Sequence, residues 1–179
     1  MADKYGAYLR KCEVAAYLME HPVPFSPVNL GDQINSASSE YHPSMPADGS
    51  YIIYTVREKS ESAHCRSMDG TFEDFYISTM GENGWTKRVN LDPPVNTDCN
   101  EGAANVSPDG RFMFFAANNR KVRDESMDIF LVEKKGNQWS IPVNLESPIN
   151  TDAFESQPSF SSDGKTLYFV SNRPGGLGG

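Results

Sequence analysis

The sequence has few basic residues and no long hydrophobic run. It contains 16 Lys and Arg against 24 Asp and Glu, which gives a formal net charge of −8. Nucleic acids and anionic membranes bind clustered Lys and Arg, so we expect neither as a partner. The only basic cluster, residues 120–123, is short, and we interpret it as a solvated loop. No stretch approaches the roughly 20 apolar residues of a transmembrane helix, so we expect no direct membrane span.

Residue patterns of catalysis and metal binding are also missing. There is no Gly-x-Ser-x-Gly, no His-Glu-x-x-His and no Cys-x-x-Cys, which are the usual residues of serine hydrolases, zinc peptidases and zinc fingers. The three histidines, His21, His42 and His64, share no spacing, and we interpret them as surface or satisfied polar side chains. We therefore expect no enzymatic activity, no cofactor and no metal.

One sequence pattern occurs three times along the chain. A polar entry leads to a short β-rich run, an Asp-Gly pair and a second, apolar run, most clearly in residues 155–176. Asp-Gly between two such runs is typical of a hairpin, because Gly accepts the positive φ that a tight turn needs. The three pairs are 61 and 54 residues apart: Asp48-Gly49, Asp109-Gly110 and Asp163-Gly164.

Other landmarks keep the same two spacings. A Val-Asn-Leu triplet begins at Val28, Val89 and Val143, and Trp85 returns as Trp139. Because all landmarks shift together, the seven extra residues of the first period must lie between Thr55 and Asp74. We expect residues 56–73 to form a lengthened loop.

A repeat of this length, built from short strands and turns, predicts one propeller blade per copy. In the middle copy we expect strands at 105–107, 112–116, 128–133 and 139–143. The second strand of each copy is apolar without alternation, which predicts burial on both faces. The fold class is therefore all-β, an incomplete β-propeller of about three blades of four-stranded antiparallel sheets with one N-terminal helix. Propellers close with four to eight blades, so we expect a fragment or one part of a larger assembly.

The chain divides into two regions. Residues 1–21 are predicted to be a helix whose apolar stripe includes Leu9 and Cys12, and such a stripe should pack against the propeller or another helical domain. Residues 22–179 form the partial propeller, with repeats starting near 40, 101 and 155. Within it, residues 24–30 match an outer strand without its own inner three, and we predict that they complete the last blade of an intact ring.

Polar residues recur at fixed places in the repeat. As a functional site, the recurring Glu with Asp98 or Asp152 would form a metal-binding ring. As architecture, which we favour, they are latches between adjacent blades, because Asn can hold a turn and a carboxylate can accept backbone N–H groups. Polar residues of the inner strands, Ser44, Asn105 and Ser159, would face the axial channel or the next blade. The recurring positions are Asn35, Asn96, Asn150, Glu40, Glu101 and Glu155.

Cys65 and Cys99 both lie on loops of the first repeat. They could pair in an oxidising compartment, and the interpretation we prefer is two unpaired thiols. Cys12 is expected to pack on the helix face.

Residues 158–169, followed by Ser171-Asn172-Arg173-Pro174-Gly175-Gly176, resemble the TolB-type, WD-like propeller repeat. The linker around Trp139, with residues 142–145 and 148–151, is similar to the version found in cell-envelope proteins of Bacteroidetes-type bacteria. In those proteins tetratricopeptide-like helices precede the propeller, and an OmpA-like peptidoglycan-binding domain follows it. The resemblance implies a periplasmic, outer-membrane-associated protein with partners in the cell envelope, and a peptidoglycan link through a domain outside this chain.

We compare three classes of function that this sequence could have. The leading hypothesis is a non-catalytic scaffold that binds protein partners, linked by the resemblance to type IX secretion or peptidoglycan-associated outer-membrane machinery. The second is the propeller domain of a hydrolase or peptidase. The third is a propeller that binds glycans or calcium through Asp and Asn side chains.

Overall fold

The computed structural model describes residues 2–59, 69–118 and 126–176. The cluster at residues 120–123, His64 and Cys65 lie outside these ranges. The elements are α1 (Ala2–Glu20), β1 (Ser39–Ser44), β2 (Tyr51–Lys59), β3 (Thr71–Gly81), β4 (Gly84–Trp85), β5 (Val89–Asn90), β6 (Glu101–Val106), β7 (Phe112–Asn118), β8 (Met127–Lys135), β9 (Gln138–Trp139), β10 (Val143–Asn144), β11 (Glu155–Phe160) and β12 (Leu167–Ser171).

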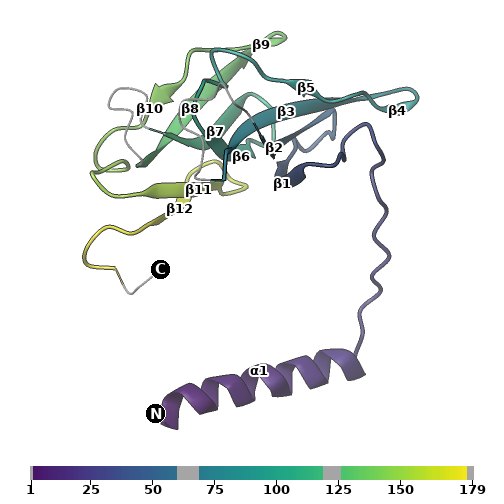
Figure 1. Cartoon of the computed structure of the whole chain (residues 1–179), viewed down its shortest axis with the longest axis vertical. Helices are drawn as coiled ribbons and strands as arrows, with labels where there is room; N and C mark the ends of the chain where they lie inside the picture. The colour runs from purple at the N-terminus through teal and green to yellow at the C-terminus, as the bar shows by residue number, and fades with distance from the viewer. Residues whose placement is uncertain (1, 60–68, 119–125, 177–179) are drawn as a thin grey trace.

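The strands form three antiparallel sheets (Figure 1). In sheet 1 the order is β1-β2-β3, and β4 and β5 both pair with β3. Sheet 2 repeats this order with β6-β7-β8, and β9 and β10 both pair with β8. Sheet 3 is the β11-β12 pair in the described part of the chain. The residues that the structure describes are therefore mostly β with one helix, as the sequence predicts.

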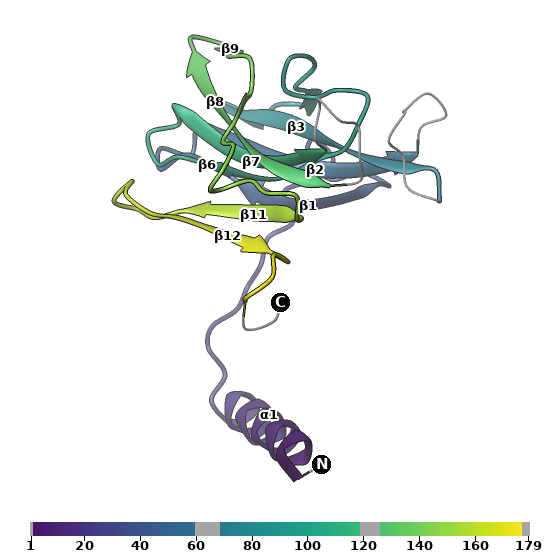
Figure 2. The same cartoon turned by 90° about the vertical axis from the view of Figure 1, so that its left-hand side faces the viewer.

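The sheets stack face to face, with sheet 2 in the middle (Figure 2). The main core lies between sheets 1 and 2. Phe75 of β3 meets Phe115 of β7 edge to face at 5.5 Å between ring centroids, and Phe115 stacks on Phe130 of β8 at 5.8 Å. Fully burying one such side chain contributes roughly 1.5–3 kcal/mol, so the Phe75–Phe115 contact helps to hold the two sheets together, while Phe130 packs beside Phe115 within sheet 2.

Burial of the second strands depends on whether a sheet covers both faces. Residues 51–56 of β2 are all buried, and so are most residues of β7, which confirms the prediction for the first two copies. The prediction is wrong for β12, where exposure alternates and Tyr168 is 63% exposed. Among the described elements β12 contacts β11 alone, so alternate side chains of β12 meet solvent.

The predicted outer strand is divided in two. Residues 139–143 were expected as one strand, but β9 ends at Trp139 and β10 starts at Val143. The Ser140 hydroxyl accepts the backbone N–H of Glu133 at 3.0 Å, where a strand would offer a carbonyl. Thr86 does the same for Thr79 in sheet 1, also at 3.0 Å. A side chain thus replaces the ladder at this point and the strand breaks.

The lengthened segment of the first copy is not all loop. The β2–β3 ladder continues to the pair Lys59↔Thr71, which is two pairs beyond the equivalent end of β7–β8. Arg57 fixes this extension, because its guanidinium donates to Thr71 Oγ1 at 2.8 Å and to Asp69 at 2.9 Å. Both ends of the predicted 56–73 loop are therefore strand, and residues 60–68 lie outside the described chain.

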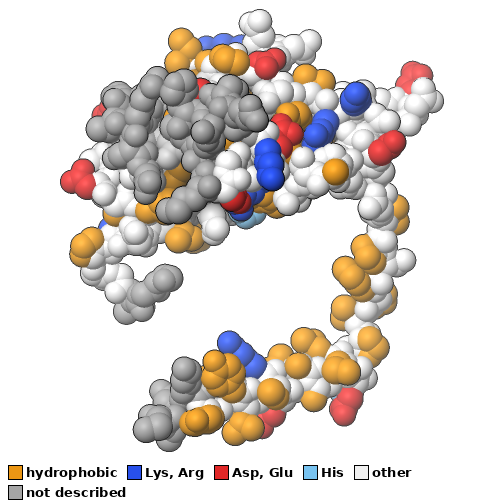
Figure 3. All heavy atoms as spheres, in the orientation of Figure 1, with side chains coloured by type: hydrophobic (Ala, Val, Ile, Leu, Met, Phe, Trp, Pro, Cys, Tyr) orange, Lys and Arg blue, Asp and Glu red, His pale blue; other side chains and the backbone are white. Residues whose placement is uncertain are grey.

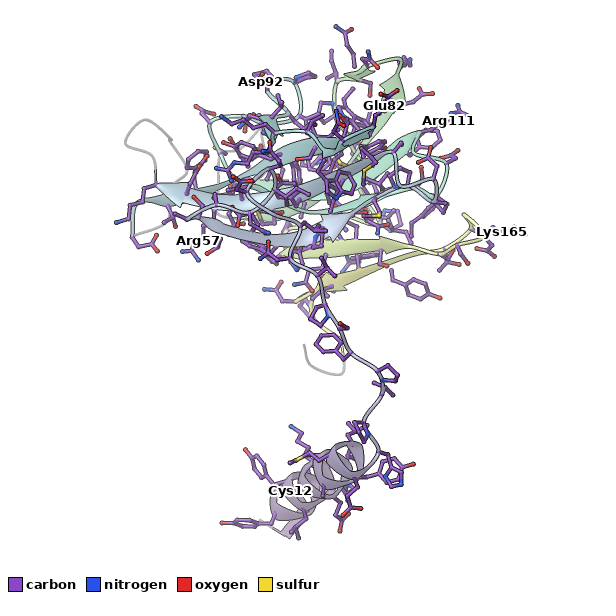
Figure 4. All side chains as sticks on the ribbon, turned by 90° about the vertical axis from the view of Figure 1, so that its right-hand side faces the viewer. Cys12, Arg57, Glu82, Asp92, Arg111 and Lys165 are labelled. Carbon is purple, nitrogen blue, oxygen red and sulfur yellow. The ribbon has the colours of Figure 1, made fainter. Side chains whose placement is uncertain are left out.

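Helix α1 stands away from the sheets, at the end of an extended linker (Figure 1). The described side chains of its apolar stripe are exposed, Leu9 at 63% and Cys12 among them, so the predicted packing on the propeller is absent from the described residues. Figure 4 shows Cys12 on this separate helix. The linker carries exposed apolar side chains as well (Figure 3), including Phe25 at 84%. The described part of the chain includes no helix with the length and apolar character to cross a membrane.

Candidate functional site

The recurring polar residues gather where one sheet passes to the next. We call each such linker, from the Asn of Val-Asn-Leu to the Glu that opens the next sheet, a joint. In joint 2, between sheets 1 and 2, Asn96 Oδ1 accepts the backbone N–H of Phe75 at 3.0 Å, and its Nδ2 donates to the carbonyl of the same residue at 2.8 Å. Asn90 Nδ2 donates to the Asp74 carboxylate at 2.8 Å. Together the two Asn side chains clamp the Asp74-Phe75 dipeptide of β3.

The clamp is held by a local turn. Asn90 Oδ1 accepts the backbone N–H of Asp92, two residues on, at 2.7 Å, and it also accepts Asn96 Nδ2 at 2.7 Å. The backbone N–H of Asn96 donates to the carbonyl of Asp92 at 3.1 Å. Asn side chains readily make such bonds to the backbone just after them. The first Asn therefore both shapes the linker and orients the second Asn.

Joint 3, between sheets 2 and 3, repeats the arrangement. Asn150 bonds the backbone N–H and carbonyl of Ile129, both at 2.8 Å. Asn144 Nδ2 donates to Asp128 at 2.7 Å, and Asn144 Oδ1 accepts the N–H of Glu146 at 2.7 Å and Asn150 Nδ2 at 2.8 Å. The same five contacts thus occur 54 residues apart in the chain.

The recurring Glu closes each joint. Glu101 accepts the backbone N–H of Thr97 at 3.0 Å and its hydroxyl at 2.6 Å. Glu155 makes the same pair of bonds to Thr151, both at 2.9 Å. Both Glu residues have 0% exposure. A buried carboxylate is tolerated only when its oxygens are bonded, so the Thr four residues earlier is a structural requirement of the site.

Glu155 has two further partners, at the end of β12 and just after it. Arg173 contacts its carboxylate at 3.1 Å, and Ser171 donates to it at 2.7 Å. Burial alone would raise the pKa of Glu155, but the hydrogen bonds from Ser171, Thr151 and Arg173 outweigh burial and leave the pKa below its usual value. Glu155 therefore stays ionised at neutral pH.

Joint 1 contains the first-copy members, Asn35 and Glu40. Asn35 Nδ2 donates to Asn29 Oδ1 at 2.9 Å, as in the other joints. Glu40 accepts the Ser36 hydroxyl and bonds Arg88 at 3.0 Å. No strand of the described chain lies in this clamp.

The Asp-Gly pairs lie in the turns between the first and second strands. Asp109 accepts the Ser107 hydroxyl at 2.6 Å and the backbone N–H of Arg111 at 3.1 Å, while Gly110 has φ of 69°. Asp163 and Gly164 repeat these bonds with Ser161 and Lys165, and Gly164 has φ of 70°. At Asp48 the carboxylate accepts the N–H of Ser50 at 3.0 Å, and Gly49 has φ of 65°. Figure 4 shows Arg111 and Lys165, which follow these turns, on the same side of the molecule.

Polar side chains of the first strands bond the next sheet. Ser44 of β1 accepts the backbone N–H of Val106 in β6 at 2.8 Å. Asn105 of β6 accepts the N–H of Phe160 in β11 at 2.8 Å. Ser159 holds the same place in β11, where it pairs with Tyr168 through the backbone, while its exposed hydroxyl bonds none of the described residues. Of the two placements expected for these side chains, Ser44 and Asn105 therefore face the next sheet.

The three first strands share a bulge that the sequence did not predict. His42, Ala103 and Gln157 have φ of 48°, 56° and 51°, and the pairing register shifts beside each of them. Such φ values are uncommon for residues other than Gly. The three bulges line one hollow of about 270 Å³, together with Pro43, Ala104 and Pro158. The backbone repeats here while the side chains differ.

Asp74, the carboxyl that Asn90 binds, has a strongly perturbed pKa. It is 6% exposed, and its Oδ1 has no hydrogen-bond partner among the described residues. Burial raises the pKa of Asp74 to about 6, and the nearby Glu58 and Asp92 charges add to burial, although the Asn90 bond opposes it. The raised pKa follows from architecture, since Asp74 is held in place by its strand.

The carboxylates do not converge on a metal site in the described residues. Asp98 and Asp152, the candidates for a ring with the recurring Glu, are both exposed. Asp152 borders a hollow of about 450 Å³ at joint 3 that also contains Asp128 and Glu146. The carboxylate oxygens of Glu155 accept hydrogen bonds from Thr151, Ser171 and Arg173.

Cys99 is buried and disulfide-bonded. The interpretation of this cysteine as an unpaired thiol is therefore wrong. Cys12 is a free, exposed thiol, and Cys65 lies outside the described residues. A disulfide in joint 2 is typical of proteins that fold in oxidising compartments.

Several residues of the joints were not selected as site residues from the sequence. They are Asn29, Asn90 and Asn144, the clamped Asp74 and Asp128, and Ser36, Thr97 and Thr151. The 61- and 54-residue spacings include the Asn and Ser/Thr positions, so the repeat itself was the available signal. The spacing alone does not indicate which of the recurring side chains bond one another.

Comparison with known proteins places few limits on identity. No protein-family model matches the chain, and no curated protein matches it. Fifteen solved chains match. One is the crystal structure of TolB from Acinetobacter baumannii, at 14% sequence identity and a TM-score of 0.41, over 80% of this chain and 40% of that chain. The chain thus spans less than half the length of that TolB.

Proposed function

We propose that the three sheets are consecutive blades of a β-propeller, and that this propeller is a non-catalytic scaffold for protein partners. Support for the blade assignment comes from three features: meandering antiparallel sheets stacked face to face, the same joint between neighbours, and first strands that converge on one hollow. In a propeller the first strands surround the central axis, which is where the His42, Ala103 and Gln157 bulges meet.

The observation that carries the binding role is the contrast within this hollow. Its backbone is held in the same sparsely populated conformation in three copies, while the side chains are an imidazole, a methyl and a carboxamide. Residues held in such conformations often lie at functional positions. Neighbouring blades are fixed by buried Asn and Glu bonds, so the hollow sits on a rigid support that suits recognition.

The finer assignment follows the sequence resemblance. We place the protein in the periplasm, associated with the outer membrane, with partners in an envelope assembly. The helix-propeller order and the Pro-Val-Asn-Leu linkers resemble the type IX secretion accessory lipoprotein PorE, and this favours type IX secretion or peptidoglycan-associated machinery. A disulfide-bonded Cys99 fits an oxidising compartment.

A photo-crosslinking experiment tests the binding face. The exposed Gln157 and His42 are replaced one at a time by a photoreactive residue in the full-length protein, in its native cells. Glu82, exposed in the β3–β4 turn, is the matched control (Figure 4). We expect a discrete envelope-protein adduct from positions 42 and 157 but not from 82. Adducts of equal yield at all three positions, or none at 42 and 157, would contradict the proposed face.

Labelling with an active-site probe tests the hydrolase alternative. We expect a fluorophosphonate to leave the purified chain unlabelled, since such probes require an activated serine. Stoichiometric labelling of one serine, lost when that serine is replaced by Ala, would replace the scaffold role with an enzymatic one.

A further inference from the structure

A cavity of about 610 Å³ lies between sheets 1 and 2, at their outer strands, and we call it the outer cavity. Sheet 1 lines it with β5 and the second half of β3, sheet 2 lines it with β9 and the end of β8, and joint 2 forms the remaining wall. All of the lining residues belong to these two sheets and the joint between them, so a further blade is not needed to form the cavity. Its volume is within the range of about 300–1,000 Å³ that is usual for small-molecule sites.

Much of the wall of the outer cavity is apolar. Ile77, Leu91 and Trp139 line it, and the same three side chains pack against the core between sheets 1 and 2. Val89 lines it from β5 and is 59% exposed. The apolar body of a ligand in this cavity therefore continues the packing of the core and removes Val89 from water.

Among the described residues, Lys134 is the one charged side chain that lines the outer cavity. It follows Phe130 and Val132 at alternate positions of β8, and both of these are buried in the core between sheets 1 and 2. Alternate residues of a strand share a face, so Lys134 lies on the face that sheet 1 covers. Its ammonium lies 3.9 Å from the centre of the Tyr51 ring and 5.8 Å from that of the Trp139 ring.

No carboxylate of the described chain forms an ion pair with this ammonium. The neighbouring cations Arg111 and Lys135 both pair with Glu133, at 3.5 and 3.4 Å. Burial lowers the pKa of Lys134, and the charge of Asp48, which acts from a longer distance, opposes this effect. A half-buried cation binds an added anion more strongly than an exposed cation does, because its surroundings screen the two charges less.

The repeat indicates that this lysine is not a requirement of the blade. Lys134 pairs with Trp139 in sheet 2, and the equivalent pair in sheet 1 is Met80 with Trp85. The Trp recurs and the Lys does not, so sheet 1 forms the same hairpin with an uncharged residue at this place. The lining also contains no Asp or Glu, although the chain has 24 acidic residues and a net charge of −8.

We propose that the outer cavity binds a small carboxylate with an aromatic body, of the arylalkanoate class. The carboxylate pairs with the ammonium of Lys134, and the aromatic body packs on Ile77 and Trp139. The exposed amides of Asn137 and Gln138 line the same cavity and offer further donors. One charge thus fixes the orientation of the ligand, and apolar side chains supply most of the contact area. The proposal uses neither the scaffold role nor the central hollow.

Binding of 4-phenylbutyrate to the purified chain tests this site. Trp85→Phe leaves Trp139 as the only tryptophan, so its fluorescence reports on the outer cavity. The control ligand is 4-phenylbutyramide, which has the same aromatic body and no charge. We expect a saturable fluorescence change with phenylbutyrate and at least about tenfold weaker binding of the amide, because a charge-assisted bond is lost. Calorimetry of the chain without the Trp85 substitution should give the same Kd for phenylbutyrate.

Variants of the lining show where the ligand binds. Lys134→Met keeps the aliphatic stem and should weaken phenylbutyrate binding at least about tenfold, with little change for the amide. The matched control is Lys135→Met, at the next residue, which is exposed and outside the lining and should leave both affinities unchanged. Val89→Glu adds a negative charge at an exposed position of the lining, and it should weaken binding of the carboxylate more than that of the amide.

Three results would overturn the proposal. They are no saturation by about 10 mM phenylbutyrate, which is weaker than a specific site requires, equal affinity for the acid and the amide, and equal effects of Lys134→Met and Lys135→Met. If circular dichroism shows that Lys134→Met is unfolded, Val89→Glu decides the question, and an unchanged affinity in that variant overturns the site. Crosslinking from positions 42 and 157 is independent of these titrations, so the two proposals can fail separately.

Discussion

Replacing the second Asn of each joint by Ala should separate the two joints that hold a strand of the described chain from the one that does not. Asn96 is 2% exposed and bonds both backbone groups of Phe75. Asn150 is 6% exposed and does the same for Ile129. The Asn35 side chain bonds only Asn29 among the described residues. Another contact that holds joint 1 is the ion pair between Glu40 and Arg88. The same substitution therefore meets three different environments in one protein.

The expected cost follows from which groups lose their partners. In Asn96→Ala the carbonyl of Phe75 keeps a bond from the N–H of Leu91 at 3.1 Å, but the buried N–H of Phe75 is left unpaired. An unpaired buried group costs about 1–3 kcal/mol, and the lost bonds of the amide add about 1 kcal/mol. We expect Asn96→Ala to lower the free energy of unfolding by about 2–4 kcal/mol. Asn150→Ala should cost a similar amount, since Leu145 still serves the carbonyl of Ile129. Asn35→Ala should cost less than about 1 kcal/mol.

Urea unfolding, followed by circular dichroism and by tryptophan fluorescence, measures these differences. With a denaturant slope of about 1–3 kcal/mol/M, the midpoint of Asn96→Ala should fall by about 1 M or more. Coincident curves from the two probes establish that one transition is observed. A midpoint for Asn35→Ala as low as that of Asn96→Ala would refute the reasoning, and so would an unchanged midpoint for Asn96→Ala.

Three further predictions concern the turns, the buried acid and calcium. Gly110→Ala should lower the thermal midpoint more than Gly49→Ala, because both have positive φ but only the Cβ at 110 meets the neighbouring sheet, Pro46 at 3.2 Å. Equal losses would contradict that contact. The folded state binds a proton on Asp74 more tightly than the unfolded state does, because its pKa is about 6 rather than 3.8. Stability from this group is therefore full below about pH 4 and lost as pH rises through 6, by about 3 kcal/mol. Asp74→Asn should remove this part of the pH dependence of urea unfolding and be the more stable form at pH 8, and an unchanged pH profile would contradict it. Millimolar calcium should leave the thermal midpoint unchanged, since the described carboxylates form no metal group, whereas a rise would indicate native-state binding.

The sequence predicted the turns and strands that depend on the chemistry of neighbouring residues in the chain. Asp-Gly pairs gave the hairpin turns, because Gly is the residue that takes positive φ there at no cost, and Gly110 and Gly164 do so at 69° and 70°. Apolar runs gave the second strands. The spacing then gave the equivalence of the copies, and so the positions of Asn96 and Glu101 without their partners.

The rest depends on contacts between distant residues. The residue type at position 103 does not predict the bulge, because Ala has no preference for a φ of 56°. Its backbone N–H is within 3.3 Å of Thr55 Oγ1 in the neighbouring sheet, so the conformation is fixed across the interface. The extension of the β2–β3 hairpin similarly depends on Arg57 meeting Asp69, a pairing that periodicity cannot reveal.

The use of Asn at the joints has a simple physical reason. A primary amide offers one acceptor and one donor with nearly the spacing of a backbone peptide group, so one side chain can bond the N–H and carbonyl of a single residue, as Asn96 does with Phe75. At that point the ladder between β3 and β5 has ended, and the edge of β3 would otherwise keep open backbone groups. The Asn96 side chain thus continues the hydrogen bonding of β3 where the backbone of the joint turns away from that strand. Asp could accept the N–H but could not donate to the carbonyl, and Gln would need an extra ordered torsion. In joint 1 the same side chain, at position 35, meets no strand of the described chain and bonds Asn29 instead.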